Sequence, residues 1–142
     1  MDDKKFEFFE TTGDVGILVY GKTAEDIFIN AGLGLYEIIT DVKKEETESR
    51  EVKIISDSIS RLFINWLNEL IFLFDTYNFV ANNINLSLAE KSGEISLESL
   101  LKGYCFDEQK DEKKLLIKAA TYHGHYLKQT EKGYEAKVLF DI

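Results

Sequence analysis

The sequence predicts an α+β fold in which two helices pack on a mixed, mostly antiparallel β-sheet. Its periodic segments follow the order strand, strand, helix, strand, helix and then a run of strands, which is typical of that class. The chain has 142 residues, of which 44% are hydrophobic, so it can bury one sizeable core but is too short for two ordinary domains. We therefore expect one domain over residues 1–142, in which the early strand–helix–strand unit could supply one parallel strand pair.

Two strands joined by a tight turn begin the chain. Apolar residues alternate with others in both segments, at Phe6, Phe8, Val15, Ile17 and Val19. The turn between the two segments contains Gly13 and Asp14, residue types that favour tight turns. We therefore expect the first two strands to pair as a hairpin.

A first helix is predicted over about Ala24 to Ile39. Thr23, with Asp26 three residues later, forms a start that resembles a capping box, and apolar residues then keep helical spacing. Residues 40–49 mix both charge signs without an apolar period, which indicates a solvated connection. Strand character resumes over residues 51–55.

The second helix has the clearest pattern in the chain. Ser56, Asp57 or Ser58 can cap its start, and apolar residues recur at steps of three and four over residues 59–74. Further apolar residues widen the stripe beyond one face. We therefore expect this helix to be the main core helix and to be covered on more than one side.

Strands follow the second helix. Period-two patterns around a Ser92-Gly93 turn predict a hairpin, and further strand-like runs cover residues 115–127 and 134–140. In the last run, the apolar residues Tyr134 to Phe140 share one face at alternate positions. Asp141 is therefore expected to point away from the core.

Acidic groups lie near both ends of the chain. Asp14 precedes the second strand, and Asp141 lies one residue from the free carboxylate of Ile142. If the two strand ends meet, three carboxylates converge. Such oxygens suit a hard divalent cation, calcium first and magnesium or manganese as alternatives, far better than zinc or copper. Calcium takes roughly six to eight oxygens, so water, main-chain oxygens or a partner would complete an open site.

Simpler interpretations exist for these residues. An aspartate after glycine most often forms a turn by accepting bonds from nearby amides, as Asp14 could, and a residue next to the terminus, such as Asp141, is often solvated. The strand pattern that runs up to Asp141 argues against fraying. His123 and His125 would share a strand face and could bind a transition metal, but spacing of two is a weak signal.

Charge and composition exclude several classes of function. The net charge of −9 repels phosphate backbones, so direct nucleic-acid binding is not expected, whereas a basic protein partner is compatible with it. The sequence lacks a run of roughly 18 apolar residues and an apolar signal segment after Met1, so we expect a cytoplasmic protein without membrane spans. The single Cys105 predicts no internal disulfide and an inert, packed thiol. No long coiled-coil seam requires an oligomer, so we expect a monomer.

Several separated segments occur in an order that one family shares. They are TGDVGI at residues 12–17, YGKTAED at residues 20–26, LNEL at residues 67–70, KAATYH at residues 118–123 and the closing DI at residues 141–142. With this combination, the chain resembles the archeases along essentially its full length. The resemblance implies a protein cofactor, not an enzyme, for the RtcB-type RNA ligase. That ligase joins tRNA exon halves with 2′,3′-cyclic phosphate or 3′-phosphate ends to 5′-hydroxyl ends.

The resemblance also implies what the protein does to the ligase and through which residues. It implies faster guanylylation and turnover of the ligase, and nucleotide use wider than GTP. Matched by position, the metal-binding residues are Asp14 and Asp141, with Ile142 contributing a main-chain or terminal oxygen. Thr11 stands where the family usually has a histidine, and Gly13 where it has an alanine. Docking of this acidic site on the positively charged nucleotide and RNA-end pocket of the ligase is the expected mechanism.

A function of another class fits some of the same residues. A metal-dependent hydrolase would use Asp14, Asp141 and His123 around a metal-bound water. Neither a Gly-rich phosphate loop nor a nucleophile elbow occurs in the sequence to support it. His123 also matches the family motif, where it is expected near the site or at an interface. A general chaperone would instead need a large exposed apolar surface.

Overall fold

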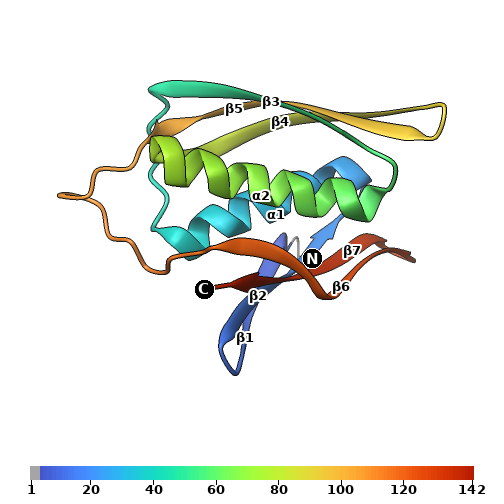
Figure 1. Ribbon diagram of the computed structural model, residues 1–142, viewed down its shortest axis with the longest axis horizontal. Coiled ribbons are helices and arrows are strands. Elements are labelled where there is room, and N and C mark those ends of the chain that lie inside the picture. Colours follow the sequence, from blue (N-terminus) through green and yellow to red (C-terminus); the bar gives the residue numbers. More distant parts are fainter. Residues whose placement is uncertain (1–3) are drawn as a thin grey trace.

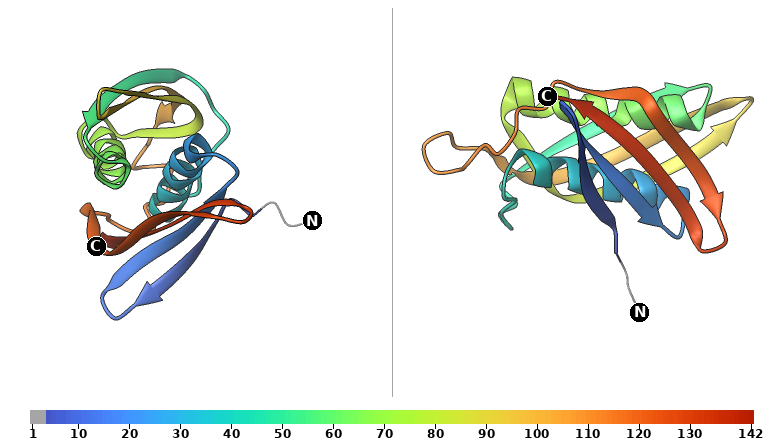
Figure 2. Two further views of the ribbon diagram at one scale, coloured as in Figure 1. Left: turned by 90° about the vertical axis from the view of Figure 1, so that its right-hand side faces the viewer. Right: turned by 90° about the horizontal axis from the view of Figure 1, so that it is seen from below.

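Two antiparallel β-sheets enclose two long helices in the computed structural model, which describes residues 4–142 (Figure 1). Residues 1–3, on which the expectation about a signal segment partly rests, lie outside the described residues. Figure 2 shows the layers edge-on, with the helices side by side between a three-stranded and a four-stranded sheet. No helix of the described part is both long and apolar enough to cross a membrane.

The helices and strands follow the predicted order. The strands are β1 Phe6–Thr11, β2 Asp14–Gly21, β3 Glu48–Ser56, β4 Phe79–Lys91, β5 Glu94–Cys105, β6 Ala119–Thr130 and β7 Gly133–Asp141, and the helices are α1 Ala24–Ile39 and α2 Ile59–Tyr77. The first sheet has the strand order β1-β2-β7-β6 and the second has the order β3-β5-β4. Neighbouring strands within each sheet are antiparallel.

The predicted fold class is confirmed, with one difference in the arrangement of the strands. We expected one mixed sheet with a parallel pair around α1, but β2 and β3 belong to different sheets and do not pair. The apolar residues of the helices explain this division. Because α2 buries Ile64 and Leu73 as well as Trp66 and Leu70, a single sheet could not cover it. The prediction that α2 is covered on more than one side is therefore confirmed.

Side chains fix both helix starts as the sequence predicts. Thr23 and Asp26 form a capping box, in which the Thr23 hydroxyl accepts from the Asp26 amide at 3.1 Å. Ser58, one of the three expected caps, accepts from the Arg61 amide at 3.1 Å. Between the helices, the buried Trp66 indole N–H donates to the Phe28 carbonyl at 2.8 Å. This bond satisfies the one polar atom of the largest core side chain.

The connection from β5 to β6 is longer than the sequence predicts. Leu115 and Leu116 were expected in a strand, but they are exposed and precede β6, which begins only at Ala119. The chain pairs with the end of α1 here, since the Thr40 hydroxyl donates to the Glu112 carbonyl at 2.7 Å. The contacts with α1 compete with pairing to β7, which explains why β6 begins only at Ala119.

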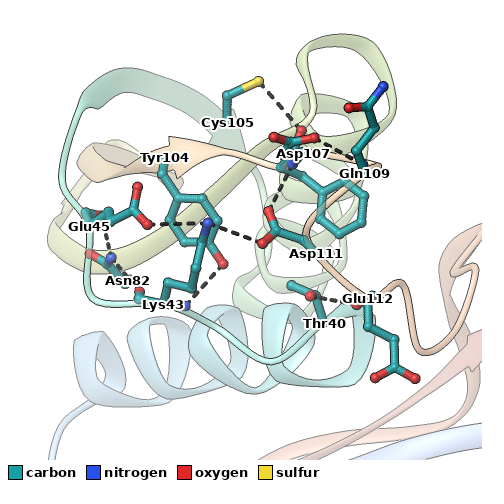
Figure 3. A network of polar contacts seen from close by, with 11 residues as sticks. Thr40, Lys43, Glu45, Asn82, Tyr104, Cys105, Asp107, Gln109, Asp111 and Glu112 are labelled. Carbon is teal, nitrogen blue, oxygen red and sulfur yellow. Dashed lines mark hydrogen bonds and ion pairs between the residues drawn. The ribbon is translucent and has the colours of Figure 1, made fainter.

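A polar network anchors the same connection (Figure 3). The Lys43 ammonium lies 3.1 Å from a carboxylate oxygen of Asp111, and the Lys43 amide donates to the Tyr104 hydroxyl at 3.0 Å. The pKa of Asp111 is lowered, first by the hydrogen bond from the Asp107 amide and also by Lys43. The connection is therefore a tethered segment with an exposed turn.

Cys105 differs from its prediction. It lies at the end of β5 with an exposed side chain, so the expected packed thiol is wrong. Alternation along β5 buries the neighbouring Tyr104 and turns Cys105 to the opposite face, which the helices do not cover.

Gly103 gives a test of the bulge in the three-stranded sheet. The β4 register shifts between Ala81 and Asn83, and a Cβ added at Gly103 would overlap the Val80 carbonyl oxygen. We expect Gly103→Ala to lower the free energy of unfolding by about 3 kcal/mol, measured by urea denaturation, because backbone must move. Lys102→Ala, at the exposed neighbouring position, should change stability by less than about 0.5 kcal/mol. Equal effects of the two substitutions would contradict this account.

Candidate functional site

The β2–β7 pairing brings the two acidic strand ends together. Its register begins with Asp14 opposite Asp141 and ends with Gly21 opposite Tyr134. Directly opposed residues project to the same side of a sheet, with Cβ atoms roughly 4.5–5.5 Å apart. The predicted meeting of the first and last acidic positions is therefore confirmed.

These two carboxylates lie on the outer face of the four-stranded sheet. Val15 and Phe140, which form the next pair of the register, are buried in the core beneath the helices. Alternation along the strands therefore turns Asp14 and Asp141 to the face without helices. Asp14 is half-buried and Asp141 is exposed, so the side chain of Asp141 points away from the core as expected.

A third strand holds the end of the chain in place. Ala119 of β6 lies opposite Asp141, and the Lys118 amide donates to the Asp141 carbonyl at 2.8 Å. The main chain of Asp141 is thus bonded between β2 and β6, and the C-terminus lies beside the start of β6 (Figure 2). Ile142, whose side chain is 41% exposed, follows Asp141 directly, so its main-chain oxygen atoms lie close to the end of β7. The predicted absence of fraying agrees with these bonds.

Neither of the two side-chain carboxylates has a partner within residues 4–142. No lysine, arginine or histidine of this part forms an ion pair with Asp14 or Asp141, and no amide donates to either carboxylate. The simpler interpretation of Asp14 as a turn former is therefore not supported by its contacts. Like charges directly opposite one another destabilise a sheet, so a cation between them would relieve repulsion.

The groups that could bind a cation here are few, and all of them are oxygen atoms. Across the described residues, no three side chains of His, Cys, Asp or Glu gather in a way that could hold a metal ion. Two aspartates and the main-chain oxygen atoms of Ile142 fit the preference of a hard cation, yet they leave most of its roughly six to eight positions open. A cation at this edge would need main-chain oxygens, water or a second molecule.

Thr11 extends the row of opposed residues across the sheet. It pairs with Asp14 from β1, so Thr11, Asp14, Asp141 and Ala119 lie in register on four adjacent strands. The sequence marked Thr11 only as a departure from a family motif, and it gave Ala119 no role. Gly13, the other departure, has a φ of +91°, and a Cβ there would meet no atom within 4 Å.

The two histidines are separated by a bulge in β6. Thr121 pairs with Leu139 and Tyr126 pairs with Lys137, so four residues of β6 lie opposite a single residue of β7. The alternation is broken there, and the expected shared strand face of His123 and His125 is wrong. His123 is exposed in the bulge and does not join the aspartates in a cluster.

His125 packs against α2. Its ring stacks on Phe63 with centroids 5.6 Å apart, and its Nδ1 lies 2.8 Å from the Lys137 carbonyl. That bond places the proton of the neutral ring on Nδ1 and leaves the buried Nε2 without a partner in the described residues. Burial lowers the pKa of His125 below its usual value near 6.5, although the bond to Lys137 opposes the shift.

Comparisons with known proteins identify the family. The model of the Archease protein family matches residues 6–142. The chain belongs to the archease family. The archease of Methanosarcina mazei is 35% identical over 141 residues, which span 98% of this chain and 97% of that protein. The archease of Saccharolobus solfataricus is 36% identical over 140 residues, at 98% and 99% coverage.

A solved structure extends this similarity to the whole archease fold. The solution structure of protein 1598 of Methanobacterium thermoautotrophicum superposes with a TM-score of 0.86 at 32% identity, covering 96% of this chain and 98% of that one. The fold that the resemblance to archeases implied is thus confirmed. The KAATYH and LNEL segments, which the sequence flagged without assigning contacts, meet beside the carboxylate pair where Asn68 bonds Ala120.

The repulsion between the opposed carboxylates predicts a stabilising substitution. Without divalent cations, Asp14→Asn should raise the free energy of unfolding by on the order of 0.5 kcal/mol, because it removes a like-charge cross-strand pair. Urea denaturation in the presence of a chelator measures the change. Glu131→Gln, in the exposed turn at the far end of β7, is the matched control and should have no such effect. Destabilisation by Asp14→Asn would instead show that the carboxylate has a structural role.

His125 predicts a pH dependence of stability. The unfolded ring takes up a proton near pH 6.5 while the folded ring, whose pKa is lower, stays neutral, so the unfolded state binds more protons. The free energy of unfolding should therefore fall as the pH drops from 7 to 5. His125→Gln should weaken this fall, measured as the pH dependence of the urea midpoint. An unchanged slope in His125→Gln would refute the assignment.

Proposed function

We propose that this archease-family protein activates an RtcB-type tRNA-splicing RNA ligase. It promotes guanylylation and multiple turnover of the ligase and broadens its nucleotide use, and it acts as a monomeric protein cofactor in the cytoplasm without being an enzyme itself. The observation that carries the proposal is the pair of unpartnered carboxylates, Asp14 and Asp141, opposed in register beside the terminal carboxylate. Membership of the archease family supports an RNA ligase as the partner.

A divalent cation, calcium first, is the proposed ligand of this edge. Asp14, Asp141 and Ile142 would hold it through carboxylate or main-chain oxygens, and the cation would supply positive charge and open coordination positions. Calcium tolerates irregular oxygen shells, whereas magnesium demands an octahedron with fixed short bonds. An edge with few ligands and wide exposure suits the more tolerant ion. Ligand atoms from the ligase could then complete the shell.

Charge guides the proposed encounter with the ligase. The net charge of −9 gives the whole molecule an attraction to a basic pocket, and such attraction raises association rates. The exposed position of Asp141 and Ile142 at a sheet edge lets them enter a concave site. Binding that favours the nucleotide-accepting conformation of the ligase would shift its population toward that conformation.

The competing hydrolase has weaker support. It would need Asp14, Asp141 and His123 around one metal-bound water. His123 instead lies in the β6 bulge, and the described residues include no cluster of three potential side-chain ligands. Assaying the protein alone on phosphate esters tests this alternative, because turnover that disappears in Asp14→Ala would favour the hydrolase.

The activator function is tested by multiple-turnover ligation with the cognate ligase. Asp14→Ala and Asp141→Ala should each lose most of the stimulation, because each removes one of two opposed carboxylates. Glu131→Ala removes the same charge from the far end of the sheet and should stimulate like wild type. Extending the chain by one alanine past Ile142 should also weaken stimulation, since it displaces the terminal carboxylate. Full stimulation by both aspartate variants, with folding intact, would eliminate the proposed mechanism.

A further inference from the structure

Asn68 of α2 makes a two-point contact with the start of β6. Its Oδ1 accepts from the Ala120 amide at 2.8 Å, and its Nδ2 donates to the Ala120 carbonyl at 3.3 Å. Both main-chain groups of one residue are thus bonded by one side-chain amide. This is the pattern that a neighbouring strand would offer, and β6 is an edge strand that lacks a second neighbour.

The contact lies one residue from the carboxylate pair. Ala119, which precedes Ala120, is opposite Asp141 in the register, and the Lys118 amide bonds the Asp141 carbonyl at 2.8 Å. Asn68 therefore fixes Ala120, which directly follows the two residues that hold the end of β7. Two sets of hydrogen bonds, joined by the main chain of residues 118–120, thus connect the core helix to Asp141.

We propose that Asn68 is a positioning residue for the C-terminal carboxylates: its amide fixes the start of β6, and β6 fixes Asp141 and Ile142. Asn68 does not touch a cation or a partner in this assignment. It acts by limiting the directions in which the Asp141 and Ile142 carboxylates can point. The consequence for metal binding or ligase activation depends on the function proposed above, whereas the consequence for the order of the C-terminus does not.

Only asparagine has a side chain of this length that can both accept from the Ala120 amide and donate to the Ala120 carbonyl. Aspartate keeps the acceptor for the Ala120 amide but places a second acceptor against the Ala120 carbonyl. Alanine removes both bonds and leaves the Ala120 groups to water. A gain of backbone motion at the start of β6 follows in either case, and it should be larger for alanine.

Asn30 of α1 offers a matched control. Like Asn68, it is an asparagine on a core helix that bonds the main chain of a strand, because its Nδ2 donates to the Tyr20 carbonyl of β2 at 2.7 Å. Tyr20 lies opposite Glu135, toward the other end of the register from Asp14 and Asp141. Asn30→Ala therefore makes the same chemical change and loosens the sheet far from the carboxylates.

The experiment compares wild type, Asn68→Ala, Asn68→Asp and Asn30→Ala. Amide hydrogen exchange at Lys118 and the NMR signal of the Ile142 methyl group report the order of the C-terminus, and calorimetric titration with calcium chloride reports metal affinity. We expect Asn68→Ala to speed exchange at Lys118, shift the Ile142 signal and weaken calcium binding about tenfold, as the loss of a supporting hydrogen bond behind a metal ligand does. Asn68→Asp should show smaller changes of the same kind. Asn30→Ala should alter none of the three readouts, although it also lowers stability.

Other outcomes separate the two proposals. Unchanged Lys118 exchange and Ile142 signal in both Asn68 variants would overturn the positioning role, as would equal changes in Asn30→Ala. Absence of calcium binding by the wild-type protein would count against the metal site and leave the exchange and methyl readouts to decide the role of Asn68. If Asn68→Ala does not fold, Asn68→Asp and Asn30→Ala supply the same comparison.

Discussion

Eight residue pairs join β2 to β7, and the remaining strands of the four-stranded sheet attach to one or the other of these two. The pairing connects an early strand with the last one, so it closes most of the chain into a single loop and carries the entropic cost of doing so. Burial repays that cost: Ile17 and Val138, opposed in the register, are both fully buried beneath the helices. Full burial of such a side chain contributes about 1.5–3 kcal/mol. The carboxylate pair thus lies at one end of a strand pairing whose inward-facing residues belong to the core.

The two helices set the architecture around that pairing. α1 and α2 present apolar residues on more than one side, and the Trp66 indole bonds the Phe28 carbonyl between them, so the helix pair behaves as one layer. Covering both faces of such a layer requires two sheets, each of which leaves an outer face to solvent. Asp14 and Asp141 lie on the outer face of the four-stranded sheet, at the ends of β2 and β7. Asp141, at the end of β7, is exposed on that face.

Local features were predictable from the sequence and long-range adjustments were not. Capping residues and apolar periods gave the bounds of α1 correctly, because those signals lie within a few residues of the structure that they cause. The meeting of Asp14 with Asp141 was predicted because each of them lies at one end of an apolar strand. The division into two sheets depends on helix coverage from both sides. The β6 bulge around His123 and the late β6 start depend on contacts with α1, α2 and β7 that no local pattern contains. The exposure of Cys105 follows from alternation along β5, but the position of the helices decides which face of that strand is covered.

The place of β7 has a consequence for how the molecule is made. This strand lies between β2 and β6, although β2, both helices and the three-stranded sheet all precede it in the chain. On a ribosome, β2 and α1 therefore emerge before β7, and the four-stranded layer cannot close until β7 has been synthesised. Apolar surface that is exposed during such an interval favours aggregation and binding by chaperones. Because β2 and β7 each contribute one aspartate, the carboxylate pair forms only when this late strand is in place.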